Sequence, residues 1–138
     1  NKFTLQSDNY ENIFVLGDTS NIPTSKAGAV VHFASEILTE NMLSIFKGEK
    51  PTVQFDGHAN CFIETGFGKA ALIDFNYDTE PLPGVYPIPV IGPMSLLKPT
   101  RINHFGKLAF RWIYLNILLR GRDLPVSTHM SMSGKKTN

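Results

Sequence analysis

A glycine and a carboxylate end a short apolar run near the start of the chain. Gly17 and Asp18 follow the run 13–16, and the segment 26–28 leads into a helical pattern. At the carboxyl end of a strand, a carboxylate can accept hydrogen bonds from sugar or ribityl hydroxyls. A helix start adds backbone N–H groups and a positive dipole end, and Gly28 would let a ligand approach closely. The alternative is that Asp18 only closes a turn.

The chain has a single cysteine, Cys61, so no disulfide can form within it. A lone cysteine is most often a small buried hydrophobe. His58 lies three residues before it, but this proximity does not establish a Cys–His pair. One Cys and 4 dispersed His lack the spacing of metal ligands, and no Gly-x-Ser-x-Gly motif is present. The spacing therefore predicts neither a metal site nor a serine hydrolase.

The segment 66–71 contains the letters of a dinucleotide-binding fingerprint, Gly-x-Gly-x-x-Ala. That fingerprint requires a helix directly after its glycines. Residues 70–75 read as a strand instead, and two glycines in a turn are ordinary. We therefore predict a turn at 66–68 and no nucleotide site there.

The segment 101–119 combines apolar, aromatic and basic residues, and Gly121 and Pro125 are expected to end its helix. Ten of the twelve residues from 108 to 119 are apolar or aromatic, and residues 98–122 contain six Lys or Arg and no acid. This composition suits a helix that lies in a membrane interface and is attracted by anionic lipid. At about 1.5 Å per residue the apolar run is too short for a bilayer core of about 30 Å. A buried C-terminal helix and an oligomer contact are the alternatives.

The composition bounds the protein class. The chain has 138 residues, about one domain, with 42% hydrophobic residues and a net charge of +1. This charge does not indicate a nucleic-acid binder. No signal peptide is visible, and the opening residues Asn1–Thr4 contain no Met. We therefore expect a piece of a longer protein.

The first half of the chain predicts a strand–helix unit. Residues 2–6 alternate as a short strand, and the apolar run 13–16 fits a central strand buried on both faces, as in parallel sheets. An apolar stripe at three- and four-residue steps predicts a helix over 25–47, which Gly48 and Pro51 end.

The second half predicts a small antiparallel sheet. Period-two patterns predict strands at 52–55, 60–65 and 69–77. Six prolines between 78 and 100 predict an extended loop without regular structure. A polar tail at 126–138, rich in Ser, Lys and Thr, is expected to be disordered.

Taken in order, these motifs resemble a known family. The segment 10–18, followed by 23–28, is similar to the second flavin-binding motif of flavoproteins with two dinucleotide-binding domains. Within that group, Phe55-Asp56-Gly57 with Cys61 and Thr65-Gly66 resembles the sulfide:quinone oxidoreductases. The basic, aromatic terminal helix is similar too. The resemblance runs from about residue 3 to 125.

The resemblance implies an α+β piece of an α/β FAD-binding flavoprotein. Residues 1–125 would form the C-terminal part of its FAD-binding and quinone-reducing domain, with a membrane-interface helix at 101–119. Cys61 would be one of two redox cysteines that take sulfide, and Phe62 would lie beside the quinone. Asp18 would hold the ribityl chain, and the helix start would face the flavin pyrimidine edge. The implied cofactor-binding residues are Gly17, Asp18, Lys26, Ala27, Gly28 and Lys98.

Two parts of the family pattern are missing from this sequence. The glycine-rich motif for the ADP part of FAD is absent, and so is the second cysteine. The piece alone is therefore expected to be inactive, and the resemblance leaves oligomerisation open. A peripheral position on a prokaryotic cell membrane is expected. The alternatives are a type II NADH:quinone dehydrogenase-like flavoprotein, which needs no substrate cysteine, and a non-catalytic membrane-binding module.

Overall fold

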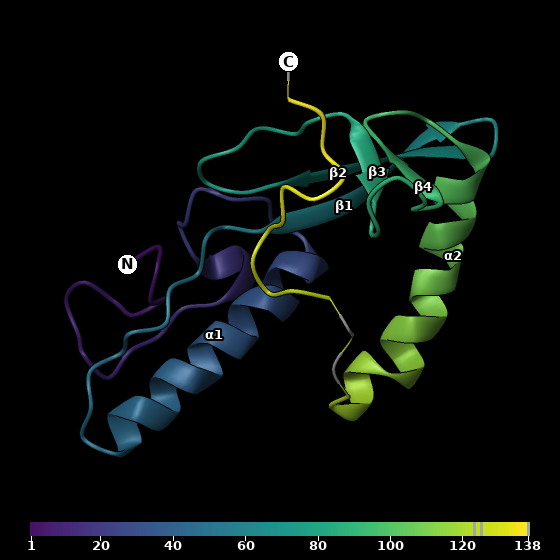
Figure 1. The fold of residues 1–138 in the computed structure, drawn as a ribbon. Helices are drawn as coiled ribbons and strands as arrows, with labels where there is room; N and C mark the ends of the chain where they lie inside the picture. The colour runs from purple at the N-terminus through teal and green to yellow at the C-terminus, as the bar shows by residue number, and fades with distance from the viewer. Residues whose placement is uncertain (123, 125, 138) are drawn as a thin grey trace. The chain divides into compact units, whose positions relative to one another are not determined.

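The computed structural model describes residues 1–122, 124 and 126–137 (Figure 1). The chain divides into two compact units. The first contains Asn1–Asn60, Phe75–Glu80 and Thr128–Met130, and the second contains the described residues of Cys61–Asp74, Pro81–Ser127 and Ser131–Asn138.

The long helix of the first unit, α1, spans Gly28–Phe46 (Figure 1). The predicted helix over 25–47 is confirmed, with a start three residues later because Ala27 is still extended. Gly48 follows the helix at φ +79°, a conformation that glycine adopts readily. The apolar stripe faces the core of the unit through Val30, Phe33, Ala34 and Ile37.

The strands predicted for the first unit do not form. Gln6 and Phe14 make one isolated antiparallel bridge, and the run 13–16 leads into the 3₁₀ helix η1, Gly17–Thr19. Val53, in the predicted strand 52–55, pairs with the side chain of Asn41 on α1 rather than with a neighbouring strand. The prediction of a central parallel strand was wrong, because these short runs satisfy their backbone groups through single bridges and a side-chain amide.

The second unit is built on a four-stranded sheet with the order β1-β2-β4-β3. A two-residue turn joins β1, Ala59–Gly66, to β2, Lys69–Phe75, so the predicted hairpin is confirmed. Along β2, buried residues alternate with more exposed ones, as the period-two pattern predicted. Figure 1 shows the hairpin in teal with the shorter strands beside it.

The proline-rich segment contains two strands that the sequence did not predict. They are β3, Gly84–Tyr86, and β4, Met94–Leu96, which pair antiparallel. Because β4 also pairs in parallel with β2, the sheet is mixed, and the prediction of a purely antiparallel sheet was wrong. Prolines flank these strands and do not interrupt them, which is the position a sheet tolerates.

The second long helix, α2, spans Arg101–Asn116 and is followed by the 3₁₀ helix η2, Leu118–Arg120 (Figure 1). The side chain of Thr100 caps α2 by accepting a hydrogen bond from the N–H of Asn103 at 3.0 Å. Gly121, at φ +67°, ends the helical segment as the sequence predicted. The other predicted terminator, Pro125, lies outside the described residues.

The polar segment that follows, which we expected to be disordered, makes specific contacts in its described part. Lys135 bridges antiparallel to Gly84 of β3, and its ammonium pairs with the buried carboxylate of Asp74 on β2. The side chains of this pair are 1% and 2% exposed. The N–H of Lys136 also donates to the carbonyl of Pro83 at 2.8 Å.

Candidate functional site

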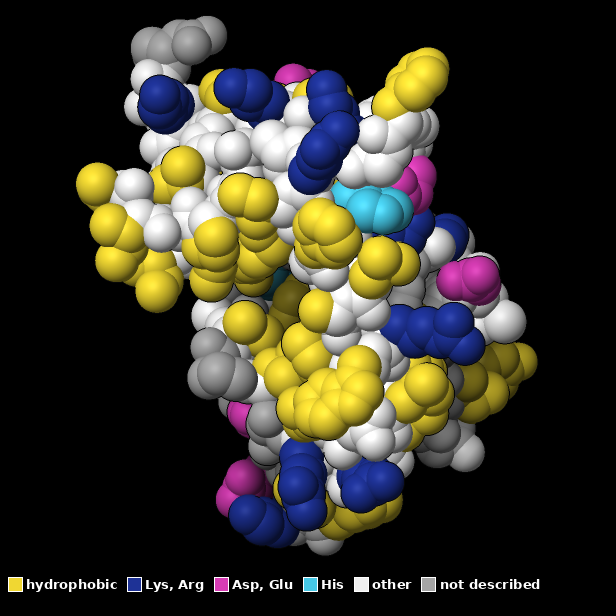
Figure 2. Space-filling view, turned by 90° about the vertical axis from the view of Figure 1, so that its right-hand side faces the viewer, with side chains coloured by type: hydrophobic (Ala, Val, Ile, Leu, Met, Phe, Trp, Pro, Cys, Tyr) yellow, Lys and Arg dark blue, Asp and Glu magenta, His cyan; other side chains and the backbone are white. Residues whose placement is uncertain are grey.

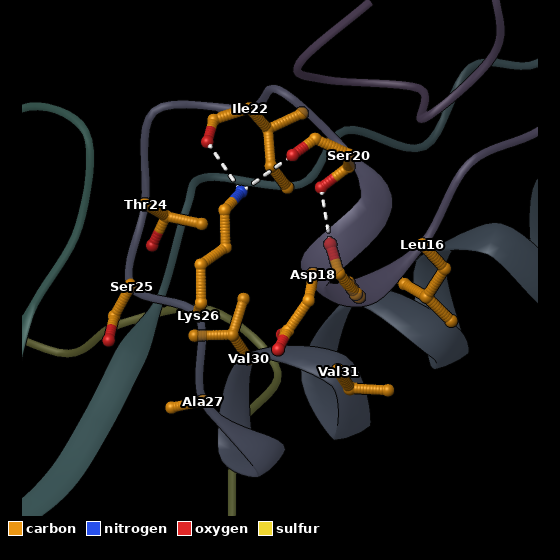
Figure 3. A pocket seen from close by; sticks show the side chains of 12 residues that line it. Leu16, Asp18, Ser20, Ile22, Thr24, Ser25, Lys26, Ala27, Val30 and Val31 are labelled. Carbon is orange, nitrogen blue, oxygen red and sulfur yellow. Dashed lines mark hydrogen bonds between the residues drawn. The ribbon is translucent and has the colours of Figure 1, made fainter.

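A shallow, open pocket lies in the first unit, between η1 and the start of α1 (Figure 3). Four of the predicted cofactor-binding residues line it: Gly17, Asp18, Lys26 and Ala27. A fifth, Gly28, directly follows Ala27 in the chain. Its apolar wall includes Leu16, Val30 and Val31. The structure therefore brings together the first-unit residues that the sequence selected.

The 3₁₀ turn presents Asp18 to the pocket. Gly17 has φ +76°, which favours glycine, and its carbonyl accepts hydrogen bonds from the N–H and the hydroxyl of Ser20 at 3.1 and 2.7 Å. These bonds close the turn without using the Asp18 side chain. Asp18 is exposed, and Figure 3 shows its side chain directed toward Val30 of α1. Its carboxylate can thus accept hydrogen bonds from a polar ligand.

Lys26 has a structural task in this loop. Its ammonium donates to the carbonyls of Ser20 and Ile22 at 2.8 and 3.2 Å (Figure 3). The hydroxyl of Thr24 anchors the same loop by donating to the carbonyl of Gly57 at 2.8 Å. Lys26 therefore places a positive charge beside the pocket while it holds the loop in shape.

The start of α1 has no side-chain cap. Ala27 is the N-cap residue and offers no hydrogen-bonding side chain, so the first backbone N–H groups remain available to a ligand or to water. A methyl group at Gly28 would have no atom within 4 Å. A polar ligand edge could approach this helix start closely.

The other predicted site residues belong to the second unit. Cys61 and Phe62 are neighbours on β1, and both are partly buried. A methyl group at Gly106 of α2 would lie 3.4 Å from the ring carbon Cζ of Phe62 and 3.1 Å from the sulfur of Met94. Phe62 thus faces α2. Because successive side chains on a strand point to opposite faces, Cys61 faces away from α2.

Lys98 precedes α2 in an exposed turn. Its carbonyl accepts a hydrogen bond from the amide of Asn103 at 3.1 Å. The same amide pairs with both backbone groups of Ser95 on β4, and Asn103 is 0% exposed. This buried side chain, which the sequence analysis did not single out, fixes the backbone at Lys98.

A charged cluster that the sequence analysis also missed joins β1 to α2. The carboxylate of Glu64 accepts hydrogen bonds from Nδ1 of His104 at 2.9 and 3.1 Å, and it lies 3.3 Å from the ammonium of Lys107. The hydrogen bond from His104 lowers the pKa of Glu64 below its usual value, and Lys107 acts in the same direction. Forty residues separate Glu64 from His104, so only the tertiary fold reveals this cluster.

One face of α2 exposes apolar side chains that recur every three or four residues. They are Ile102, Phe105, Leu108, Trp112, Leu115 and, in η2, Leu119. Figure 2, which views the protein from the side of α2, shows hydrophobic side chains gathered on this face with Lys and Arg side chains near them. Only Asn103 of α2 is buried. Within the described residues, α2 therefore lies at the surface of its unit and not in its core.

The described residues contain neither a membrane-spanning helix nor a metal-binding cluster. No helix among residues 1–122, 124 and 126–137 combines the length and apolar character needed to cross a bilayer. No group of three or more His, Cys, Asp or Glu side chains in that part of the chain is arranged to hold a metal ion.

The sequence has characterised relatives, although no family model matches it. It is 41% identical over 81 residues to the mitochondrial sulfide:quinone oxidoreductase of Mus musculus, covering 59% of this chain and 18% of the relative. The corresponding enzyme of Dictyostelium discoideum is 37% identical over 130 residues, 90% of this chain and 28% of the relative. The enzyme of Schizosaccharomyces pombe is 36% identical over 78 residues, which cover 56% of this chain and 17% of the relative. The chain spans less than a third of each relative.

A solved structure shares the fold. It is a chain of the cryo-EM structure titled Tetrahymena thermophila mitochondrial ATP synthase, F1Fo composite tetramer model, with a TM-score of 0.57 and 24% identity. The match covers 83% of this chain and 24% of that one. At this level of identity the likeness concerns the fold alone.

The relatives correct one prediction and confirm another. All three are named mitochondrial and come from eukaryotes, so the expected prokaryotic cell membrane was wrong. The sequence is sulfide:quinone oxidoreductase-like over most of its length, as its residues predicted.

Proposed function

We propose that this chain forms part of a mitochondrial, membrane-associated flavoenzyme that oxidises sulfide and reduces a quinone. The observation that carries the proposal is the 37% identity to a mitochondrial sulfide:quinone oxidoreductase over 130 residues. The pocket lined by Gly17, Asp18, Lys26 and Ala27 supports it independently.

The residues of the pocket fit part of FAD. Asp18 supplies an exposed carboxylate that can accept bonds from ribityl hydroxyls, and the uncapped start of α1 supplies N–H donors for a polar ring edge. These N–H groups and the positive end of the helix dipole would also stabilise negative charge on a reduced ring. When bound, FAD supplies two-electron redox chemistry. We assign Lys26 to shaping the loop, and Lys98 to the surroundings of the flavin.

Cys61 is proposed as one of two redox cysteines, the second of which is not in this sequence. A sulfide ion that attacks a disulfide between them breaks the S–S bond. One sulfur becomes a persulfide and the other a thiolate, so the electron pair of the broken bond stays on the leaving sulfur. Adjacent positions on β1 would keep this sulfur chemistry on one face of the strand and Phe62, the proposed quinone contact, on the other.

The exposed apolar face of α2 supports a membrane contact. Arg101, Lys107 and Arg111 accompany the apolar residues, and no acid occurs from 98 to 122. An amphipathic helix with this charge lies in an anionic interface, where a lipid-soluble quinone would be accessible.

The test is the visible absorption spectrum of the full-length protein that contains this sequence, recorded without oxygen before and after sulfide is added. Bleaching of flavin bands by sulfide is expected. Flavin that stays oxidised with sulfide and bleaches with NADH would favour the type II dehydrogenase. A protein without flavin that still binds liposomes would favour the non-catalytic membrane module.

A cysteine variant tests the assignment of Cys61. Cys61→Ser should abolish bleaching by sulfide and leave the flavin bound. Ile63→Ala on the same strand, at a side chain 47% exposed, is the control and should bleach normally. Normal sulfide oxidation by the serine variant would show that the assignment of Cys61 is wrong.

A further inference from the structure

A carboxylate and an imidazole form a hydrogen-bonded pair beside Phe62. Glu64 follows Phe62 by two positions on β1, so the two side chains share the strand face that meets α2. Both contacts are present in the second unit, since Phe62 lies against Gly106 and Glu64 bonds to His104. The pair and the ring therefore lie along the same contact between β1 and α2.

The hydrogen bond defines which nitrogen of His104 is available. An ionised carboxylate only accepts hydrogen bonds, so Nδ1 must hold the proton that it donates to Glu64. In the described part of the chain, the other ring nitrogen, Nε2, has no hydrogen-bond partner, and the side chain is 26% exposed. An imidazole oriented in this way by a carboxylate can gain or lose a proton at Nε2.

We propose that His104 donates a proton to a quinone held at Phe62, and that Glu64 is the positioning residue for its ring. This inference rests on the proposed function. A quinone takes up two electrons and two protons to become a quinol, and the electrons are those removed from sulfide. One N–H bond at Nε2 of the imidazolium breaks and an O–H bond forms on the quinone. Water supplies the second proton and later reprotonates Nε2.

The surrounding charges are compatible with this role. On α2, His104 has Arg101 three residues before it and Lys107 three residues after it, and β1 contributes Glu64. Strand β4, which packs on α2, has no titratable side chain, and η2 contributes Arg120 beyond the far end of the helix. Glu64 is thus the anion in hydrogen-bond contact with His104, and Lys107 partly offsets its charge.

The experiment separates the two half-reactions in the full-length flavoprotein. Flavin bleaching by sulfide is timed without quinone, and reoxidation is then timed with a short-chain benzoquinone. His104→Gln keeps a donor for Glu64 but cannot shuttle a proton. It should slow reoxidation by about 10²–10⁴-fold and leave bleaching unchanged. The quinone-induced shift in thermal midpoint should also be unchanged, because quinone binding does not need the proton.

Three further variants distinguish proton transfer from a structural contact. His104→Ala should regain part of its reoxidation rate when imidazole is added, which a lost structural contact would not do. Glu64→Gln should slow reoxidation less than His104→Gln does. His32→Gln removes the comparable pair on α1, in which His32 lies 3.5 Å from Glu36, and should leave both half-reactions unchanged.

Two failures are distinguishable. Normal reoxidation by His104→Gln, or a His104→Ala variant that imidazole does not rescue, would overturn the role of His104. The proposed function would stand in that case, because bleaching by sulfide does not involve this residue. If sulfide does not bleach the flavin of the wild-type protein, the proposed function itself is wrong.

Discussion

Asn103 of α2 pairs with both backbone groups of Ser95 on β4. Its amide nitrogen donates to the Ser95 carbonyl at 2.8 Å, and its oxygen accepts from the Ser95 N–H at 3.1 Å. In the first unit, Asn41 of α1 pairs in the same way with Val53, at 2.9 and 3.0 Å. Both asparagines are 0% exposed. In each unit, a helix therefore fixes a neighbouring backbone segment through an asparagine side chain, which bonds to both backbone groups of one residue as a paired strand would.

Replacing Asn103 tests this relationship. Asn103→Leu keeps the approximate volume but leaves the Ser95 backbone groups and the Lys98 carbonyl without this partner. We expect the free energy of unfolding to fall by about 3 kcal/mol, since each buried polar group left unpaired costs about 1–3 kcal/mol. Asn116→Ala, on the exposed hydrogen bond from Asn116 to Trp112, is the control. It should change stability by no more than about 0.5 kcal/mol in urea unfolding. Equal effects of the two variants would contradict the role of Asn103.

These asparagines also show what the sequence could and could not predict about the fold. An apolar stripe predicted α1, a run of apolar and aromatic residues predicted α2, and period-two alternation predicted the hairpin, because each pattern is local. Asn41 occupies a buried position of the α1 stripe, and a polar residue there was the available signal of a buried partner. The three-residue strands β3 and β4 are too short for a periodic pattern, so tertiary pairing determines them.

The candidate sites also contain some features that the local sequence could predict and others that it could not. Gly17, Asp18 and Lys26 lie within ten residues of one another, so their meeting around one pocket could be predicted from local turns and a helix start. The carbonyl partners of Lys26 could not, because they depend on the exact path of the loop. The pairing of Glu64 with His104 depends on how α2 packs on β1, which residue spacing does not reveal.

The buried pair of Asp74 and Lys135 predicts a strong dependence of stability on the C-terminal segment. Lys135→Met leaves the Asp74 carboxylate buried without its cation, so we expect the free energy of unfolding to fall by about 3–5 kcal/mol. Adding Asp74→Asn to this variant should recover part of the loss, because it removes the buried charge. Both values come from urea unfolding of the purified chain.

Lys136 provides the matched control for that pair. It is adjacent to Lys135 but exposed, so Lys136→Met should change stability by less than about 0.5 kcal/mol. A loss below about 1 kcal/mol for Lys135→Met would mean that the pair contributes little and that the segment is held by its backbone hydrogen bonds.

Tyr86 predicts a loss of stability at alkaline pH. Burial raises its pKa to about 12, and the nearby Asp74 carboxylate acts in the same direction. The unfolded state would release this proton near pH 10, whereas the folded state retains it until about pH 12. The stabilisation is therefore complete below pH 10 and is lost as pH rises through this window. Tyr86→Phe should flatten the decline measured by urea unfolding. Tyr10→Phe, at a side chain 62% exposed, should leave the slope unchanged.

The exposed face of α2 predicts binding to vesicles that contain anionic lipid. Phe105 and Trp112 are 65% and 62% exposed on this face, so replacing both by Ser should weaken binding at least tenfold, since each loses apolar area that the interface would bury. Binding should also weaken in high salt, because Arg and Lys attract the lipid headgroups. Leu43→Ser with Phe46→Ser, on the exposed end of α1, removes similar apolar area as a control. Cosedimentation with the vesicles measures the binding of the unmodified protein and of both double variants. Equal losses of binding for the two double variants would indicate nonspecific adhesion instead of a contact through α2.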